Sequence, residues 1–194
     1  MVRAGLAGLL VVLMFGVAVA GMPVQRTVGG VAFPTTVLLP QGALSLRGAG
    51  VLRYGVFFRA YVAALYADDS QPQVLLGPDT TRRLEIVYFV DIDRERITAF
   101  AEQRLREQLA ADAWSSLAPR VRAWHAAFRD VHDGDRYVMQ YSDGWLSLSL
   151  NGVTLISVAD PELATAYFGI WLGEQPIDAG LRRALLGEGR VTDV

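Results

Sequence analysis

The sequence predicts an α+β domain in which helices lie on one face of a large antiparallel sheet. Three observations support this prediction. Segments with period-two patterning and turn residues fill the first part of the chain, two segments with helical periodicity follow, and strand patterns return before two more helices. A chain of 194 residues can form one such domain with a sizeable core, and we assign this domain to residues 21–194.

The domain is predicted to begin with a hairpin and a short strand. Residues 27–39 contain a Gly-Gly pair and a proline, which are typical of an edge hairpin. Residues 40–42 read Pro-Gln-Gly and predict a turn. A strand is expected at residues 43–46, and the glycines within residues 48–50 are expected to end it.

The middle of the sheet is predicted from two apolar runs. Residues 51–66 form the longest aromatic and β-branched run, which indicates a central strand or hairpin buried on both faces. Residues 83–90 predict another strand. A three-stranded meander is expected later in the chain, because Asp143-Gly144 and Asn151-Gly152 supply the residues that hairpin turns need where φ is positive. Its strands are predicted at residues 136–141, 145–150 and 153–158.

Helical periodicity and capping residues identify four helices. Apolar residues recur every four positions after Asp93, which is a suitable N-cap. Pro119 is expected in the first turn of the second helix, and Asp160 precedes a proline that opens the third. The predicted helices run from Asp93 to Leu109, from near Ser116 to before Asp130, from Asp160 to Leu172 and from Asp178 to Gly187.

The composition excludes several kinds of chemistry. The chain has no cysteine, so disulfides, thiol nucleophiles and cysteine-ligated metals are excluded. All 18 basic residues are arginine, which excludes Schiff-base chemistry and a P-loop lysine. A formal net charge of -2 argues against a nucleic-acid partner. We therefore expect neither a cofactor nor a metal site.

The first 20 residues are predicted to direct export. Residues 4–20 carry no charge and follow Arg3, and Ala18-Val19-Ala20 is a site that a signal peptidase accepts. We expect cleavage after Ala20 and a periplasmic or secreted protein. An uncleaved membrane anchor is the alternative, since the apolar run reaches the lower limit for a spanning helix. No membrane span is expected after cleavage.

One charged residue stands out in the apolar run. Arg53 has aromatic neighbours, and a guanidinium is costly to desolvate without an anionic partner. Arg59 poses the same question, and a bend at Gly55 would separate the two arginines. Either they lie at an exposed edge or pair with an internal acid such as Glu85, or Arg53 clamps a carboxylate with the Tyr61 hydroxyl at the mouth of an aromatic-walled cavity.

Three segments strongly resemble the bacterial chalcone isomerase-like family. Residues 48–53 read Gly-Ala-Gly-Val-Leu-Arg, residues 57–66 read Phe-Phe-Arg-Ala-Tyr-Val-Ala-Ala-Leu-Tyr, and residues 170–177 read Ile-Trp-Leu-Gly-Glu-Gln-Pro-Ile. The resemblance spans residues 27–187. It implies an open-faced sandwich, with helices layered on an antiparallel sheet and a ligand cleft between them. It also implies that Arg53 corresponds to the catalytic arginine of the plant enzymes.

Other positions depart from the plant enzymes. Tyr61 stands where they have a threonine, while Asp93, Phe100 and Ile170 fall near their tyrosine, asparagine and late threonine or serine. Cyclising a chalcone needs polar groups that polarise the enone carbonyl. Phe100 and Ile170 offer none.

Arg53 and Tyr61 instead look like the arrangement of the non-catalytic fatty-acid-binding members, in which an arginine and a tyrosine hold the carboxylate. The resemblance therefore implies a binder of a fatty acid or a similar amphipathic carboxylate. Two alternatives remain: an isomerase or lyase acting on an unidentified small molecule, and a protein-contact role with a vestigial cleft. The expected ligand-binding residues are Arg53, Phe57, Tyr61, Phe100, Phe168 and Ile170.

Overall fold

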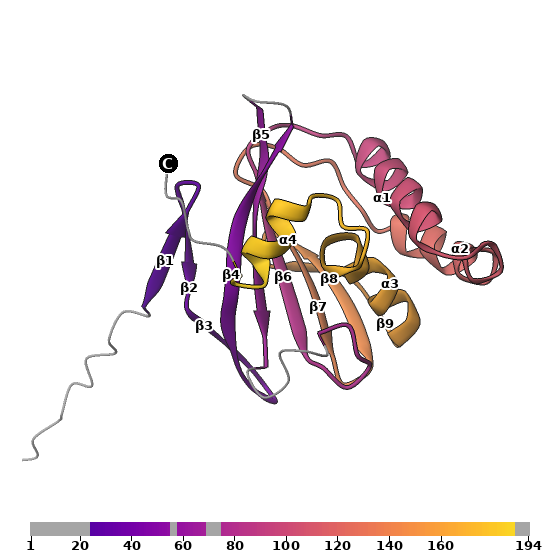
Figure 1. Ribbon diagram of the computed structural model, residues 1–194, viewed down its shortest axis with the longest axis horizontal. Coiled ribbons are helices and arrows are strands. Elements are labelled where there is room, and N and C mark those ends of the chain that lie inside the picture. Colours follow the sequence, from indigo (N-terminus) through magenta and orange to yellow (C-terminus); the bar gives the residue numbers. More distant parts are fainter. Residues whose placement is uncertain (1–23, 55–57, 69–74, 189–194) are drawn as a thin grey trace, which may run out of the picture.

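The computed structural model describes residues 24–54, 58–68 and 75–188, so the predicted leader lies outside the described residues. Within these residues the strands are β1 (Gln25–Val28), β2 (Val31–Pro34), β3 (Thr36–Leu39), β4 (Gly42–Tyr54), β5 (Phe58–Ala67), β6 (Arg82–Tyr88), β7 (Arg136–Ser142), β8 (Trp145–Leu150) and β9 (Val153–Val158). Strands β3 to β9 form one antiparallel sheet in sequence order, and β1 pairs with β2 alone (Figure 1). The α+β fold predicted from the sequence is confirmed.

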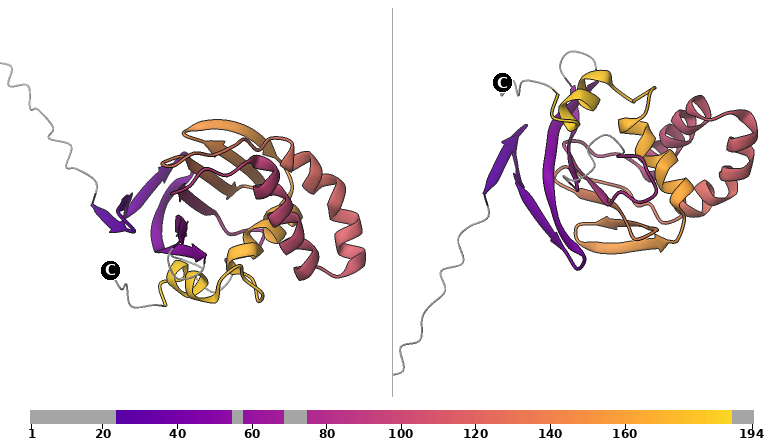
Figure 2. Two further views of the ribbon diagram at one scale, coloured as in Figure 1. Left: turned by 90° about the horizontal axis from the view of Figure 1, so that it is seen from above. Right: turned by 60° about the horizontal axis from the view of Figure 1, so that its bottom comes forward.

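Four helices pack against one face of this sheet, which curls around them (Figure 2). They are α1 (Arg94–Gln108), α2 (Ala111–His125), α3 (Pro161–Leu172) and α4 (Ala179–Leu185). The main core lies between the helices and the sheet, where Leu105, Trp124 and Phe168 are fully buried or nearly so. Within the described residues, no helix has the length and apolar character needed to cross a bilayer.

The other face of the sheet is covered in part by the β1–β2 hairpin. Phe33 of β2 is completely buried in a second, smaller core with Leu44, Val62 and Tyr66. Strand β5 therefore has helices on one face and the hairpin on the other, which explains why every residue from Tyr61 to Ala67 is buried. The expected two-sided burial of this run is confirmed from Tyr61 onward, whereas Phe58 and Arg59 at the start of β5 are exposed.

Strand β4 does not end at its glycines, which corrects the expectation for residues 48–50. It continues through them to Tyr54. A Cβ on Gly48 would lie 2.0 Å from the carbonyl oxygen of Ala184, and one on Gly50 would lie 2.7 Å from the Cβ of Ala184. These glycines let α4 approach the strand closely, because a side chain at either position would collide with the helix.

Helix α2 begins at Ala111, earlier than the start expected near Ser116, and Pro119 lies in its interior. A proline inside a helix costs about 3 kcal/mol. Burial of Leu117, Val121 and Trp124 on the same helix offsets this cost, since each fully buried large apolar side chain contributes roughly 1.5–3 kcal/mol. Tertiary packing therefore stabilises a helix that begins ahead of its proline.

The predicted meander and the caps of α3 and α4 agree with the structure, whereas Asp93 is the N-cap residue of α1 without a side-chain capping hydrogen bond. Asp143 and Asn151 have φ of 51° and 50° at the turns that flank β8. Asp160 accepts a hydrogen bond from the Leu163 N–H at the start of α3. Asp178 does the same for the Leu181 N–H at the start of α4, at 2.6 Å.

Candidate functional site

A cavity of about 490 Å³ lies between the sheet and helices α1 and α3. Its volume falls within the range of roughly 300–1,000 Å³ that is usual for small-molecule sites. Strands β4 to β8 supply one wall, α1 and α3 supply the opposite wall, and the segment that leads into α4 completes the rim. The cavity is therefore the cleft that the sequence resemblance implied between sheet and helices.

The inner part of the cavity is apolar. Leu84 on β6 faces Met139 on β7, which in turn faces Leu148 on β8, so the antiparallel register places the three side chains on one surface. All three are buried and line the cavity. Ile170 of α3 closes this part from the helical side. An acyl chain or another apolar group fits such a surface by the hydrophobic effect.

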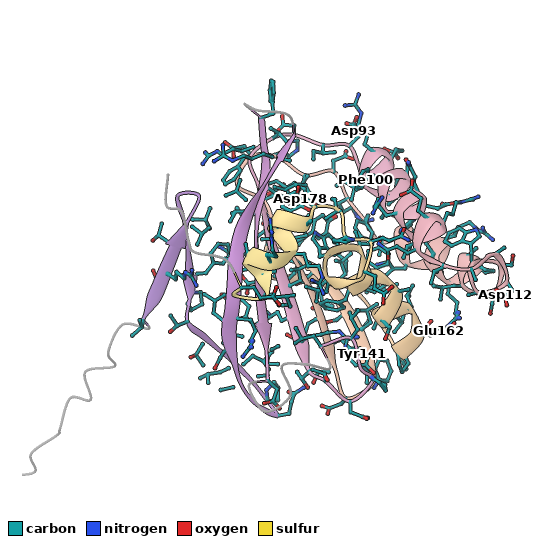
Figure 3. The ribbon with its side chains drawn as sticks, in the orientation of Figure 1. Asp93, Phe100, Asp112, Tyr141, Glu162 and Asp178 are labelled. Atoms are coloured by element: carbon teal, nitrogen blue, oxygen red, sulfur yellow. The ribbon has the colours of Figure 1, made fainter. Side chains whose placement is uncertain are left out.

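Charged residues are confined to the rim. Arg53, Arg96 and Asp178 line the cavity, and all three are exposed. They come from three elements: the end of β4, the first turn of α1 and the residue before α4. Phe100 belongs to the same rim, and Figure 3 labels it together with Asp178. The cavity thus has a charged mouth and an apolar interior.

Tyr61 places a hydroxyl in the cavity wall. It lies on β5 between Leu52 of β4 and Tyr88 of β6, and 7% of it is exposed. Its oxygen accepts a hydrogen bond from Trp171 Nε1 at 2.9 Å. Burial raises the pKa of the Tyr61 phenol above its usual value, with the Trp171 bond acting against this and Asp178 adding to it. The phenol stays protonated and can donate to an acceptor in the cavity.

Arg53 lies at the mouth in an exposed position, which corrects the expectation of a two-sided apolar environment. The register shifts between Leu52 and Arg53, and Arg53 then pairs across the strands with Arg59. Arg59 does not line the cavity. Its guanidinium lies 4.4 Å from the centre of the Phe89 ring and donates to the carbonyl oxygen of Gly29 at 3.2 Å. Arg53 and Arg59 therefore have different surroundings, although they pair directly across the strands.

Glu85 is not a partner of Arg53, although the sequence left this pairing open. It is buried and forms salt bridges with Arg83, at 2.8 Å, and with Arg136. Glu85 pairs with Ala64 in the register and lies beside Tyr66, which belongs to the core on the face of the β1–β2 hairpin. It therefore contributes no charge to the cavity.

The structure brings together four of the six expected ligand-binding residues. Arg53, Tyr61, Phe100 and Ile170 all line the cavity, whereas Phe57 lies outside the described residues. Phe100 is 47% exposed on α1 and forms part of the rim.

Phe168 does not line the cavity. Its ring is buried elsewhere, 4.8 Å from the guanidinium carbon of Arg82. Helical geometry explains this difference, because Tyr167, Ile170 and Trp171 share the face of α3 that meets the cavity, and Phe168 points about 100° away from Tyr167.

Most of the lining residues were not identified from the sequence as part of the site. Tyr88 and Tyr167 contribute aromatic surface, Arg96 contributes charge, and Trp171 orients the Tyr61 hydroxyl. The strand pattern together with the register predicts that Tyr61 and Tyr88 lie opposite each other. The hydrogen bond between Trp171 and Tyr61 joins residues 110 positions apart, so no local sequence pattern predicts it.

A partly buried polar pair lies behind the cavity wall. His125 Nε2 and the Tyr167 hydroxyl are 2.8 Å apart, and the His125 ring packs edge-on against Phe128. Burial lowers the pKa of His125 to about 4, so the imidazole is neutral near pH 7. This pair fixes the Tyr167 ring in the wall. Among the described residues, no group of histidine and acidic side chains has the arrangement of a metal site.

Comparisons with known proteins agree with this architecture. A fatty-acid binding protein of Arabidopsis thaliana has a similar structure, with a TM-score of 0.65 and 15% sequence identity over 81% of this chain and 92% of that chain. At this identity the similarity concerns the fold alone. No curated protein matches the chain. The family model described as chalcone isomerase-like matches residues 25–187, which include the whole sheet and all four helices, and the chain therefore belongs to the chalcone isomerase-like family.

Proposed function

We propose that this protein binds a fatty acid or a similar amphipathic carboxylate, without catalysing a reaction on it. The apolar tail occupies the inner part of the cavity, and the carboxylate lies at the mouth beside Arg53 and Tyr61. The distribution of charge carries this proposal: the charged lining residues are exposed at the rim, while the inner walls are formed by buried apolar and aromatic side chains. An amphipathic molecule matches this distribution in only one orientation.

The head group is held by two donors of different kinds. Arg53 offers a guanidinium at the solvent boundary, where a carboxylate keeps part of its hydration. Tyr61 offers a buried hydroxyl whose oxygen already accepts from Trp171, so its own proton is available to the ligand. Asp178 also lines the rim and repels an anion, so the carboxylate is expected to lie on the Arg53 side of the mouth.

Two further observations support binding. The similar structure from Arabidopsis thaliana is a fatty-acid binding protein, and its fold is shared over most of both chains. The cavity is open rather than filled by side chains, which disfavours a vestigial cleft. We also propose that binding takes place outside the cytoplasm, which rests on the leader-like residues 1–20.

Native mass spectrometry of protein purified under mild conditions tests the proposal directly, because a co-purified acid adds its mass to the protein. Titration with a saturated long-chain fatty acid gives the affinity. We expect Ala101→Phe to weaken binding at least about tenfold, since Ala101 lines the cavity and a larger ring there displaces several methylenes. Ala123→Phe on the exposed side of α2 is the control.

If neither method detects a bound fatty acid, the proposed function is contradicted. Equal affinity of the wild type and the Ala101→Phe variant would place the ligand outside this cavity. A thermal melt of each variant shows that the fold is retained, since overpacking of a core costs typically about 1–3 kcal/mol.

A further inference from the structure

The β4–β5 hairpin extends past the sheet at the mouth of the cavity. The last residue of β6 that pairs with β5 is Tyr88, which lies opposite Tyr61. Strands β4 and β5 continue beyond this point through the pairs Arg53–Arg59 and Tyr54–Phe58. In Figure 1 these strand ends stand at the top of the molecule, beyond β6. Among the described residues, no third strand pairs with this part of the hairpin.

The exposed end of the hairpin combines an aromatic ring with positive charge. Phe58 is 70% exposed, and its neighbours Arg53 and Arg59 are exposed as well. We call these three residues the hairpin-end surface. Residues 47–67 contain three arginines and no acidic residue, so the charge of the hairpin is not compensated within it.

The hairpin-end surface adjoins the opening of the cavity. Arg53 belongs to both, and the neighbouring Leu52 and Ala60 also line the cavity. Phe100 lies on the α1 side of the same opening and is 47% exposed. Apolar side chains thus lie on two sides of the mouth, where water would otherwise meet the entering ligand.

We propose that the hairpin-end surface docks on an anionic lipid bilayer and brings the mouth of the cavity against the membrane. This inference rests on the proposed function, because a membrane is the place where amphipathic carboxylates accumulate. Phe58 enters the boundary between head groups and acyl chains, while Arg53 and Arg59 remain beside the lipid phosphates. The ligand then passes between bilayer and cavity without crossing bulk water.

The distribution of charge around the mouth indicates that the hairpin, rather than α1, faces the bilayer. On the α1 side, Asp93 lies 3.8 Å from Arg96, and Asp91 lies 3.4 Å from the His132 ring. Acids there offset the bases and would repel lipid phosphates. Arg59 instead interacts with the Phe89 ring and the Gly29 carbonyl, which leaves its full positive charge uncompensated by any acid on the hairpin.

Sedimentation with lipid vesicles tests the docking. The two vesicle types are pure phosphatidylcholine and equal parts of phosphatidylcholine and phosphatidylglycerol. We expect the protein to bind the second type more tightly, and added salt to weaken this binding. Phe58→Ser should weaken it at least about tenfold through lost apolar contact. Arg59→Gln should weaken it about fivefold, and Arg59→Lys should restore it because the charge returns.

Leu38→Ser is the matched control. Leu38 is 84% exposed on β3 and pairs with Ala43, at the opposite end of β4 from the hairpin-end surface. All proteins share one N-terminus, determined by mass spectrometry, so any contribution from the leader is equal. Without vesicles, Phe58→Ser should bind free fatty acid like the wild type, because Phe58 does not line the cavity.

Equal binding to the two vesicle types, or wild-type binding by Phe58→Ser, would refute the docking proposal. An equal loss in Phe58→Ser and Leu38→Ser would also refute it, since apolar exposure anywhere would then suffice. A protein that binds anionic vesicles through Phe58 but takes up no fatty acid would support docking and contradict the proposed function. The two proposals therefore fail in distinguishable ways.

Discussion

Replacement of Arg53 by alanine tests how the head group is recognised. We expect Arg53→Ala to weaken binding of a long-chain fatty acid and to leave binding of the alcohol of the same chain length nearly unchanged. The tail supplies most of the affinity to both ligands, because each buried methylene contributes roughly 0.8 kcal/mol. Only the acid carries a charge that the guanidinium can attract, so the difference between the two ligands isolates the contribution of Arg53.

The position of Arg53 sets the size of this effect. A fully desolvated, charge-assisted hydrogen bond contributes about 1.5–3 kcal/mol. Arg53 is exposed at the mouth, where solvent screening reduces an ion pair to roughly 0.2–1 kcal/mol. The ligand itself shields one side of the contact, and we therefore expect a loss of about three- to tenfold for the acid.

Calorimetric titration of wild type and variant with both ligands measures the two losses. Arg122→Ala is the control, because Arg122 is an exposed arginine on α2 that does not line the cavity. Equal losses for acid and alcohol would show that Arg53 acts on the fold or on the tail. No loss for either ligand would remove Arg53 from the site and shift the argument to Arg96, the other arginine of the rim.

Three further predictions concern stability and processing. Because burial lowers the pKa of His125 from 6.5 to about 4, the unfolded chain takes up a proton before the folded one, so stability is full above about pH 6.5 and falls towards pH 4. The fall is up to about 3 kcal/mol, and chemical denaturation across this range should show a flatter profile for His125→Phe; an unchanged profile would disprove the assignment. Gly48→Ala should lower the melting temperature more than Gly50→Ala, since a new Cβ at Gly48 meets the α4 backbone at 2.0 Å and one at Gly50 meets a side chain at 2.7 Å; the reverse order would contradict close packing as the reason for these glycines. N-terminal sequencing of the protein from the cell envelope should begin at Gly21, and a cytoplasmic chain that begins at Met1 would disprove export.

Much of the fold could be predicted because its determinants are local. Asp160 accepts from an N–H three residues away, and Asn151 needs only its own backbone and a following glycine to form a hairpin turn. Alternation of side chains along the strands likewise depends on neighbouring residues alone. Predictions failed where a distant segment intervened: α4 packs on Gly48, and packing of the buried face of α2 stabilises a helix that begins at Ala111, ahead of Pro119.

The same distinction between local and long-range determinants applies to the candidate site. The sequence by itself determined that Arg53 and Tyr61 belong to one apolar run that forms a strand or a hairpin, and only a hairpin brings residues eight positions apart together. Only the tertiary structure decided that Arg53 is exposed at a rim while Tyr61 is buried and bonded to Trp171. The exposure of a side chain and its hydrogen-bond partners depend on which surfaces meet when the sheet curls and the helices pack on it. These surfaces come from segments that are far apart in the chain.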